Sequence, residues 1–415
     1  MISVRRAAAA LAAGAVLSTT AAGVAAAAPS PSPSPAKLPA GLYGTKDPTY
    51  DGVWRQSLAF LAQRTSGIQP ADQAVDWLLG QQCDSGAFAS YRPEPGKPCD
   101  AKTMLDSNAT AAAVQALTAV QRRSAAPEKT EKAAKAGAAW LKSVQNKDGG
   151  WSYTPGGPSD ANSTSIAISA FIAVGEHPGE TKSAEGKNPY DALLTFALPC
   201  TDKDGAGAFA YQPDKTGKLL ANADATAAAT LGGLGKGITA RGAQPEQPPV
   251  CTDPAKPAVD RAALNGASYL AAQLAKSGHL TTPPMPGAAE TAELPDYGNT
   301  ADAVVALAAA GAKKEATGAL AWLEKNSAAW AEESGPAAYA QLVFAAHAMD
   351  TDPRSFGTTD LLKGLNAAGP APKAPDNSQA STTDEDEGGF DVWWIIGIGT
   401  VIGVGVGFLL SGRKK

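Results

Sequence analysis

The stretch from residue 137 to 151 shows the hydrophobic and polar pattern that recurs along the chain. Its sequence is GAAWLKSVQNKDGGW, in which Trp140 and Leu141 fall on one face of a helix. Residues 146–150 are asparagine, lysine, aspartate and two glycines, a composition that favours a tight turn. Trp151 then follows as an apolar anchor. The pattern predicts a short helix, a glycine turn and an aromatic side chain that packs back on the helix.

The same spacing occurs in other parts of the chain. An aromatic residue precedes a glycine by nine positions in four segments, which are Trp77 to Gly86, Trp140 to Gly149, Phe196 to Gly205 and Tyr269 to Gly278. A fifth copy begins at Trp322, but Ala331 stands where its glycine is expected. Fixed spacing of this kind is typical of an internal structural repeat.

A second, polar motif follows each turn and precedes an alanine-rich run. Its versions are DSNAT at 106–110, DANST at 160–164, NADAT at 222–226 and YGNT at 297–300. Aspartate, asparagine, serine and threonine cap helix N-termini, because their side-chain oxygens accept backbone N–H groups that lack a partner within the helix. Each repeat is therefore predicted to contain a helix, a glycine turn, an irregular loop, a cap and a second helix.

These repeats predict an all-α fold. Residues 54–63 form one expected helix ahead of the first repeat, five helix pairs follow to about Met349, and residues 359–365 offer a last short helix. With the first and last helices counted as one split pair, there are about six helical hairpins, which can close into a double ring. We expect the aromatic–glycine helices on the outside and the alanine-rich helices on the inside.

The two ends of the chain have a different character. Residues 1–28 are typical of a secretory signal peptide, with an apolar alanine-rich run after two arginines; a membrane anchor is the alternative. Residues 29–48 are expected to be a Pro/Ser-rich linker before a repeat domain at 49–366. Residues 367–391 have the composition of a disordered acidic stalk.

The last part of the chain predicts a membrane anchor. Residues 392–410 contain no charge and are long enough to cross a bilayer, and the basic tail at 411–415 marks the cytoplasmic side. The expected localisation is the plasma membrane, with a single transmembrane helix and the large domain outside the cell.

Charge and cysteine content narrow the picture further. The formal net charge is −5 and no cluster of lysine and arginine is interleaved with aromatic residues, so nucleic acid is not an expected partner. An even number of cysteines in an exported protein favours disulfides. We expect the pairs Cys83–Cys99 and Cys200–Cys251, because each brackets the loop of one repeat. A zinc site is the rival interpretation, but the three histidines lie far from the cysteines in sequence.

The repeat resembles a known family motif. Gly137, Trp140, Leu141, Gln145, Gly149 and Trp151 closely resemble the QW repeat of squalene and terpene cyclases, and Trp77, Leu78, Gln82, Gly86 and Phe88 match it almost as well. The resemblance covers roughly residues 50–365. It implies an α/α toroid, the superfamily of triterpene cyclases, protein prenyltransferase β subunits, complement thioester domains and cobalamin carriers of the transcobalamin type.

The motifs that the catalytic branches require are not found in the sequence. The nearest run to the Asp-x-Asp-Asp acid of a class II cyclase is Asp202-Lys-Asp204-Gly205, which lacks the last aspartate and is expected in a turn. A magnesium-binding DDxxD motif, a prenyltransferase zinc set and a thioester motif are also missing. We therefore expect no catalytic and no metal site, although paired glycosidase carboxylates stay open as an alternative.

The starts of the inner helices are the candidate ligand-binding residues, because parallel inner helices would gather them at one end of the ring together with their backbone N–H groups. The set is Asp106, Asn108, Thr110, Asp160, Asn162, Thr164, Asn222, Asp224, Thr226, Tyr297, Asn299 and Thr300. The simpler interpretation is that these residues are helix caps and nothing more.

Together these features suggest a membrane-anchored extracytoplasmic binding module. Similarity to the cobalamin-carrier branch makes cobalamin or another bulky amphipathic ligand the expected cargo, delivered to an uptake system. Those carriers have a second, smaller β domain for which this chain has no room, so a separate protein would have to supply it. The alternatives are a secreted terpene-cyclase-like or glycan-acting enzyme, and a scaffold that binds proteins of the cell envelope.

Overall fold

The structure, a computed structural model, describes residues 38–244, 246, 248–282 and 293–373, and these are almost entirely helices and loops. The predicted signal peptide, the predicted transmembrane helix and residues 374–391 of the predicted acidic stalk lie outside the described residues. The first part of that stalk, residues 367–373, is described and contacts the domain, for example through the Ala368 and Pro370 carbonyls, which accept from Gly44 and Tyr43. Within the described ranges, no helix is both long and apolar enough to cross a bilayer.

The helices follow one another as the repeats predict. Their bounds are α1 Gly52–Thr65, α2 Asp72–Gly80, α3 Ser107–Val120, α4 Pro127–Ser143, α5 Ala161–Ala173, α6 Pro189–Leu194, α7 Ala223–Gly233, α8 Val259–Ser277, α9 Tyr297–Ala309, α10 Lys313–Asn326, α11 Ala328–Ser334, α12 Pro336–Ala348 and α13 Leu361–Ala367. Three short 3-10 helices, η1 Gln121–Arg123, η2 Pro178–Glu180 and η3 Pro353–Ser355, lie in the connections.

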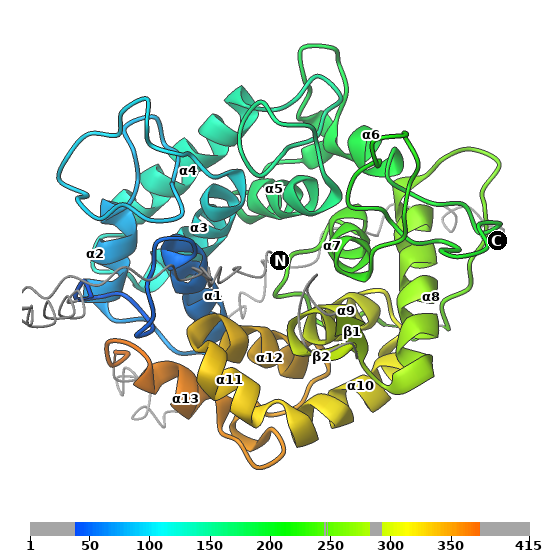
Figure 1. The fold of residues 1–415 in the computed structure, drawn as a ribbon. Coiled ribbons are helices and arrows are strands. Elements are labelled where there is room, and N and C mark those ends of the chain that lie inside the picture. The colour runs from blue at the N-terminus through cyan, green and yellow to red at the C-terminus, as the bar shows by residue number, and fades with distance from the viewer. Residues whose placement is uncertain (1–37, 245, 247, 283–292, 374–415) are drawn as a thin grey trace, which may run out of the picture. The chain divides into compact units, whose positions relative to one another are not determined.

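Six of the helices contact one another in a closed cycle. Helix α1 packs on α3, α3 on α5, α5 on α7, α7 on α9, α9 on α12, and α12 packs back on α1 (Figure 1). A second set lies against this cycle: α2 contacts α1, α4 contacts α3, α6 contacts α5, α8 contacts α7, α10 contacts α9, and α11 and α13 contact α12. We call the first set the inner helices.

The inner helices are the alanine-rich ones. Alanine leaves little side-chain bulk between neighbours, and helices α5 and α12 are buried on nearly every side rather than along one stripe. Ser165 of α5 and Gly232 of α7 show how close the approach is, because a Cβ added at Gly232 would lie 2.9 Å from the Ser165 hydroxyl oxygen. Small residues are therefore what allow the cycle to close.

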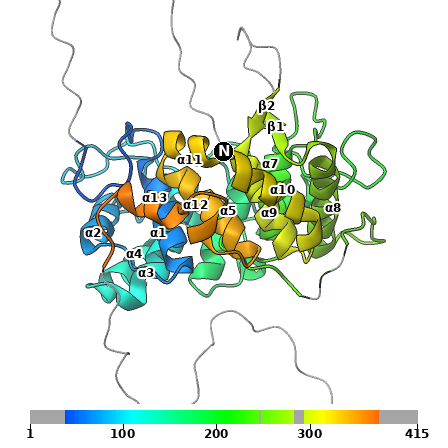
Figure 2. The ribbon, with the colours of Figure 1, turned by 90° about the horizontal axis from the view of Figure 1, so that it is seen from below.

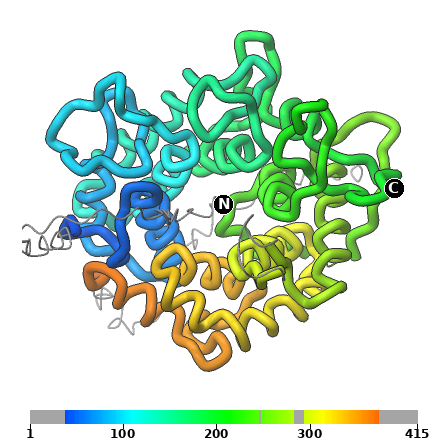
Figure 3. Tube along the Cα trace, viewed as in Figure 1, coloured from blue at the N-terminus to red at the C-terminus, as the bar shows by residue number. Residues whose placement is uncertain are grey.

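The chain closes the cycle by bringing its two described ends together. The Gly44 N–H donates to the Ala368 carbonyl at 2.7 Å, and Gln63 in α1 donates to Asn366 in α13 at 2.7 Å (Figure 3). Tyr43 is fully buried, although the sequence places it in a linker. The ordered domain therefore begins ahead of residue 49.

In the first two repeats the glutamine holds the glycine turn, because Gln82 donates to the Gly86 carbonyl as Gln145 does to that of Gly149. In the second repeat, Gln145 donates to the Gly149 carbonyl at 2.8 Å, and the indole of Trp151 donates to the Leu141 carbonyl at 2.8 Å. Gly149 has a φ of +93°, and a Cβ there would collide with the backbone of Asn188. This turn requires glycine both for its backbone conformation and for the close approach of the neighbouring repeat.

Two repeats depart from the nine-residue spacing. In the third repeat the left-handed glycine that precedes the buried anchor Phe209 is Gly207, two positions beyond Gly205, and its first helix α6 is short. In the fifth repeat no glycine stands at position 331, and the helix α11 occupies the place of the turn, ending at Gly335. Between α8 and α9 the chain adds the antiparallel strands β1 Leu280–Thr282 and β2 Leu294–Asp296 (Figure 2).

Both expected disulfides are confirmed. Cys83 is bonded to Cys99 and Cys200 to Cys251, with Cα–Cα distances of 5.6 and 5.7 Å. No cysteine is free to bind zinc. The Cys83–Cys99 bond joins the turn of the first repeat to the loop that follows it, whereas the Cys200–Cys251 bond joins the turn of the third repeat to the connection between α7 and α8.

The loop after α7 crosses the end of the domain at which the inner helices finish. The Lys236 carbonyl accepts from Ser169 of α5 at 3.1 Å, and the Ala243 N–H donates to Ala308 of α9 at 2.9 Å. The last described residue, Lys373, is fixed at the same end, because its N–H donates to the Gln69 carbonyl at 3.0 Å just beyond α1. The opposite end holds the starts of the inner helices.

Candidate functional site

The inner helices all start at one end, which we call the mouth. The first turns of α1, α3 and α5 are each linked to the loop before the next inner helix by a backbone hydrogen bond: Val53 N–H donates to the Ser90 carbonyl at 2.9 Å, Ser107 to Tyr153 at 3.0 Å, and Ala161 to Tyr211 at 3.1 Å. Each bond satisfies an N–H that the helix itself leaves without a partner. These N–H groups are consequently engaged within the protein, unlike the ligand-directed N–H groups expected from the sequence.

Four of the helix starts are capped in the same way. Asp106, Asp160, Asn222 and Asp296 accept the N–H three residues ahead, at distances of 2.9, 2.6, 2.8 and 3.0 Å. The first three belong to the predicted site, whereas Asp296 was missed. The sequence contained a usable signal for Asp296, because this residue precedes Thr300 by the same four positions that separate Asp106 from Thr110.

The four threonines of the predicted site tie the helix starts to the turns. Thr110, Thr164, Thr226 and Thr300 are fully buried. Their hydroxyl oxygens accept the backbone N–H of Phe88, Trp151, Phe209 and Leu280, at distances of 2.9, 3.1, 2.9 and 2.9 Å. Because both the residues and their partners lie in the core, these threonines hold three aromatic anchors and Leu280 in place and do not face a ligand.

Three inner helices carry an asparagine or aspartate at the second position, Asn108 in α3, Asn162 in α5 and Asp224 in α7. Asn162 in α5 donates to Asp224 in α7 at 2.7 Å. The side-chain oxygens of Asn108 and Asn162 and the hydroxyl of Ser107 are buried, and none has a hydrogen-bond partner among the described residues. Buried polar atoms are nearly always paired, so three unpaired atoms at the starts of the neighbouring helices α3 and α5 indicate a site that a ligand can complete.

A second pair of polar residues lies on α9 and α12. Gln341 donates to Asp302 at 3.0 Å. Burial, followed by the nearby charge of Asp224, raises the pKa of Asp302 to about 7. We call Asn162, Asp224, Asp302 and Gln341 the mouth cluster. Sequence analysis missed Asp302 and Gln341, although a lone carboxylate inside the run ADAVVALAAAG was a usable signal.

A stack of four half-buried aromatic rings adjoins the mouth cluster. His279 lies on Trp322 with ring centroids 4.1 Å apart, Trp322 on Tyr297 at 5.0 Å, and Tyr297 on Trp330 at 5.5 Å. Gly298 links the stack to the cluster, because a Cβ added there would lie 3.3 Å from Gln341 and 3.7 Å from Trp330. The predicted site residue Tyr297 belongs to this aromatic stack. The remaining one, Asn299, donates to the Asp296 carboxylate at 2.7 Å.

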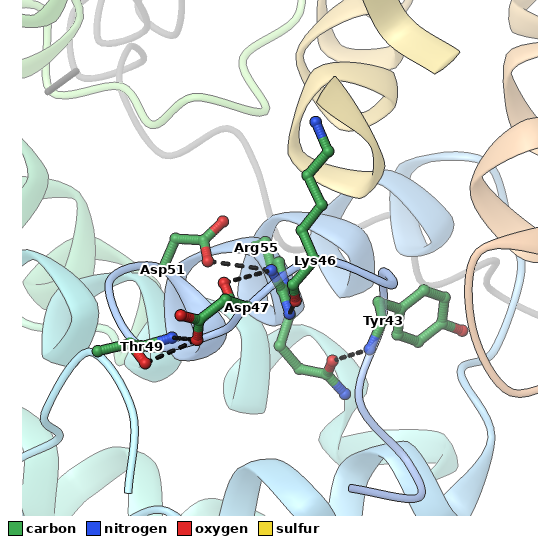
Figure 4. Close-up of polar contacts among 7 residues, drawn as sticks. Tyr43, Lys46, Asp47, Thr49, Asp51 and Arg55 are labelled. Atoms are coloured by element: carbon green, nitrogen blue, oxygen red, sulfur yellow. Dashed lines mark hydrogen bonds and ion pairs between the residues drawn. The ribbon is translucent and has the colours of Figure 1, made fainter. Parts of the chain in front are cut away.

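The start of α1 is built differently from the other helix starts. Asp51 makes no capping bond and instead forms an ion pair with Arg55 at 3.1 Å, while Arg55 also donates to the Lys46 carbonyl at 2.9 Å (Figure 4). Asp47 accepts from Thr49 beside this pair. Burial lowers the pKa of Arg55 and raises the pKa of Asp51. The buried guanidinium thus holds the preceding loop rather than offering its charge to solvent.

Two further sequence expectations concern metals and acids. In the part of the chain that the structure describes, no group of three His, Cys, Asp or Glu side chains is arranged to hold a metal ion. Asp202, the nearest approach to a cyclase acid, accepts the N–H groups of Asp204 and Gly205 at 3.0 and 2.8 Å. It therefore stabilises a turn.

No protein-family model and no curated protein matches the chain. Among solved structures, similar chains include a sugar epimerase from a ruminal bacterium, with 15% identity and a TM-score of 0.44 over 69% of this chain and 80% of that one. Another is a protein from Actinoplanes, with 16% identity and a TM-score of 0.32 over 71% and 100% of the two chains. At these scores, neither likeness carries an argument about function.

Proposed function

We propose that residues 49–366, together with the packed flanking residues 38–48 and 367–373, form an α/α toroid of six helical hairpins and serve as the binding module of a membrane-anchored extracytoplasmic protein. The closed cycle of inner-helix contacts supports the fold. The two disulfides are consistent with an oxidising, extracellular location. The predicted transmembrane helix at 392–410 supplies the anchor, and an uptake system or another envelope protein is the expected partner.

The ligand binds at the mouth in this proposal. The observation that carries it is the group of buried, unpaired acceptor atoms on Asn108, Asn162 and Ser107. Leaving such atoms unpaired costs roughly 1–3 kcal/mol each, a cost that a ligand with N–H or O–H groups removes when it binds. The ligand is therefore expected to carry hydrogen-bond donors on its edge.

The aromatic stack adds a preference for ring-shaped ligands. Half-buried indole and phenol rings offer apolar surface next to the polar groups of the mouth cluster. Apolar surface with a few directed polar groups is the usual composition of a small-molecule site. A corrinoid such as cobalamin, with a large ring and amide groups around it, fits this chemistry.

Isothermal titration calorimetry of the full-length chain with cobalamin tests the proposal. Asn162→Ala is expected to weaken binding about tenfold, because it removes one acceptor and the partner of Asp224. Asn188→Ser, which retains a helix cap at α6 outside the mouth, is the matched control and should bind normally. Absence of heat at high micromolar cobalamin would rule out the corrinoid, and equal loss in both variants would rule out the mouth.

A glycan-acting enzyme is the second candidate, favoured by the chemistry of Asp302. A carboxyl group with a pKa of about 7 beside a second carboxylate, Asp224, suits a general acid in glycoside hydrolysis. Release of reducing sugar from a panel of polysaccharides is the test. Activity that disappears in Asp302→Asn would support the enzyme, whereas release that is absent, or unchanged in this variant, would reject it.

A further inference from the structure

A cavity of about 460 Å³ lies beside the start of α3, separate from the mouth cluster. Its wall is the loop of residues 89–105, which the Cys83–Cys99 bond ties to the turn of the first repeat. Tyr50 and Tyr153 enter it from the loops before α1 and α5. We call it the loop pocket. Its volume lies within the range of small-molecule sites.

Three polar side chains, Ser90, Asp106 and Tyr153, form the floor of the loop pocket. The Ser90 hydroxyl donates to an Asp106 carboxylate oxygen at 2.8 Å. That bond uses the single proton of Ser90, so in the 3.1 Å contact between Ser90 and Tyr153 the tyrosine hydroxyl is the donor. Both hydroxyl groups thus direct their protons into the protein and present lone pairs to a ligand. The floor is an acceptor surface with a buried carboxylate behind it.

Three basic residues line the loop pocket, of which Lys102 is exposed to solvent while Arg92 and Lys97 are engaged by neighbouring groups. Arg92 is 8% exposed. Its guanidinium donates to five backbone carbonyls, those of Gly80, Gln81, Gln82, Pro95 and Lys97. The Lys97 ammonium lies 2.7 Å from Glu94. Arg92 therefore holds the loop in shape. Its guanidinium is not free to bind an anion through two parallel hydrogen bonds, as an unengaged arginine would.

The rim carries apolar side chains that face solvent. Tyr50 is 69% and Met104 is 72% exposed, the two largest values among the exposed large apolar residues of the described chain. An aromatic face attracts cations through its electron-rich surface, and a methionine side chain adapts to ligands of different shape. The rim suits the carbon skeleton of a ligand whose charged end reaches the floor.

We propose that the loop pocket binds a small ligand with a protonated primary amine, such as an amino sugar or an aliphatic diamine. The ammonium group donates to the oxygens of Ser90 and Tyr153 and is neutralised by Asp106. The carbon skeleton lies against Tyr50 and Met104. The loop pocket shares no residue with the mouth cluster, and the proposal does not require ligand capture there.

Calorimetry on the full-length chain with matched ligand pairs tests the chemistry. The β-1,4-linked disaccharide of glucosamine is compared with cellobiose, and cadaverine with 1,5-pentanediol. The amine of at least one pair is expected to bind at least about tenfold more tightly than its neutral counterpart, as loss of charge-assisted hydrogen bonds implies. Equal affinities within both pairs, or no binding by either amine, would overturn the proposal.

Variants locate the binding in the pocket. Asp106→Asn keeps an oxygen to cap α3 but removes the charge, and it is expected to weaken amine binding about tenfold. Asp160→Asn is the matched control, because Asp160 caps α5 in the same way and does not line the loop pocket. A drop in the first variant alone supports the site, and an equal drop in both overturns it.

A surface variant covers the case in which Asp106→Asn fails to fold. Tyr50→Ala changes an exposed rim residue and should leave the melting temperature unchanged. It is expected to weaken amine binding severalfold, in line with an exposed cation–π contact. Unchanged amine affinity in Tyr50→Ala, with the melting temperature preserved, would place the amine elsewhere on the protein.

Discussion

At the scale of single residues, the polar motif before each inner helix serves several purposes at once. Its first residue caps the helix, and its threonine accepts the N–H of the aromatic anchor. The residue between them is the one that faces neighbouring helices, as Asn162 does toward Asp224. The capping interpretation of the sequence therefore accounts for Asp106 and Thr110, whereas Asn108 and Asn162 keep unpaired oxygens that capping does not explain.

Asp302 gives a test at this scale. Its folded pKa is about 7, while an unfolded aspartate titrates near ~3.9. The folded state therefore keeps a proton that the unfolded state has lost. The resulting stabilisation is fully present below about pH 4 and is lost as the pH rises through 7.

Asp302→Asn is expected to flatten the pH dependence of the free energy of unfolding between about pH 4 and 7, by at most about 1.4 kcal/mol per pH unit. Chemical denaturation at stepped pH measures the slope. The exposed Asp84 offers a control, since Asp84→Asn should keep the wild-type slope. A wild-type slope in Asp302→Asn would contradict the raised pKa.

At the scale of elements, the helix and turn of the repeat could be predicted because the interactions that define them are local in sequence. Trp140, Gln145, Gly149 and Trp151 act within one helix and one turn, so their spacing predicted both. The register of the third repeat was assigned two residues too early, because the nine-residue spacing selects Gly205 whereas Gly207 adopts the left-handed conformation. The run GAFA at 86–89 recurs at 207–210 and was the usable signal. Helix α11 was not predicted either. It replaces the expected turn, and position 331, where the glycine of that turn was expected, is an alanine.

The glycine turn of the second repeat predicts a contrast between two substitutions. Gly149→Ala combines a positive φ with a backbone collision, so we expect it to lower the free energy of unfolding by about 3 kcal/mol or more. Gly175→Ala also has a positive φ, +79°, but no heavy atom lies within 4 Å of the added Cβ. It should cost only about 1–2 kcal/mol. Urea denaturation compares them, and equal losses would show that the contact with Asn188 is unimportant.

At the scale of the whole molecule, the helices and disulfides were predictable but their functional surfaces were not. The cysteine pairing followed from which loop each pair brackets. The mouth cluster and the loop pocket each combine residues from three or more separate segments, such as Tyr50, Ser90 and Tyr153. Contacts of that kind depend on how the helices pack, and no local sequence pattern predicts that packing.

The two disulfides should contribute unequally to the stability of the domain. Cys200 and Cys251 are 51 residues apart, whereas Cys83 and Cys99 are 16 apart, and longer loops lose more entropy on closure. Replacing both cysteines by alanine is expected to cost about 4 kcal/mol for the first pair and about 3 kcal/mol for the second. Guanidinium denaturation of the two double variants measures the difference, and the reverse order would contradict the loop-length argument.

The position of Lys373 has a practical consequence for the use of this domain. The backbone and ammonium groups of Lys373 bind Gln69 and Asp72, beyond the finish of α1. A tag or sensor surface joined after this residue would emerge from the side of the protein away from the helix starts. Immobilisation through the carboxyl-terminal side should therefore leave the proposed binding regions accessible to molecules in solution, which makes it the preferred attachment for ligand screening.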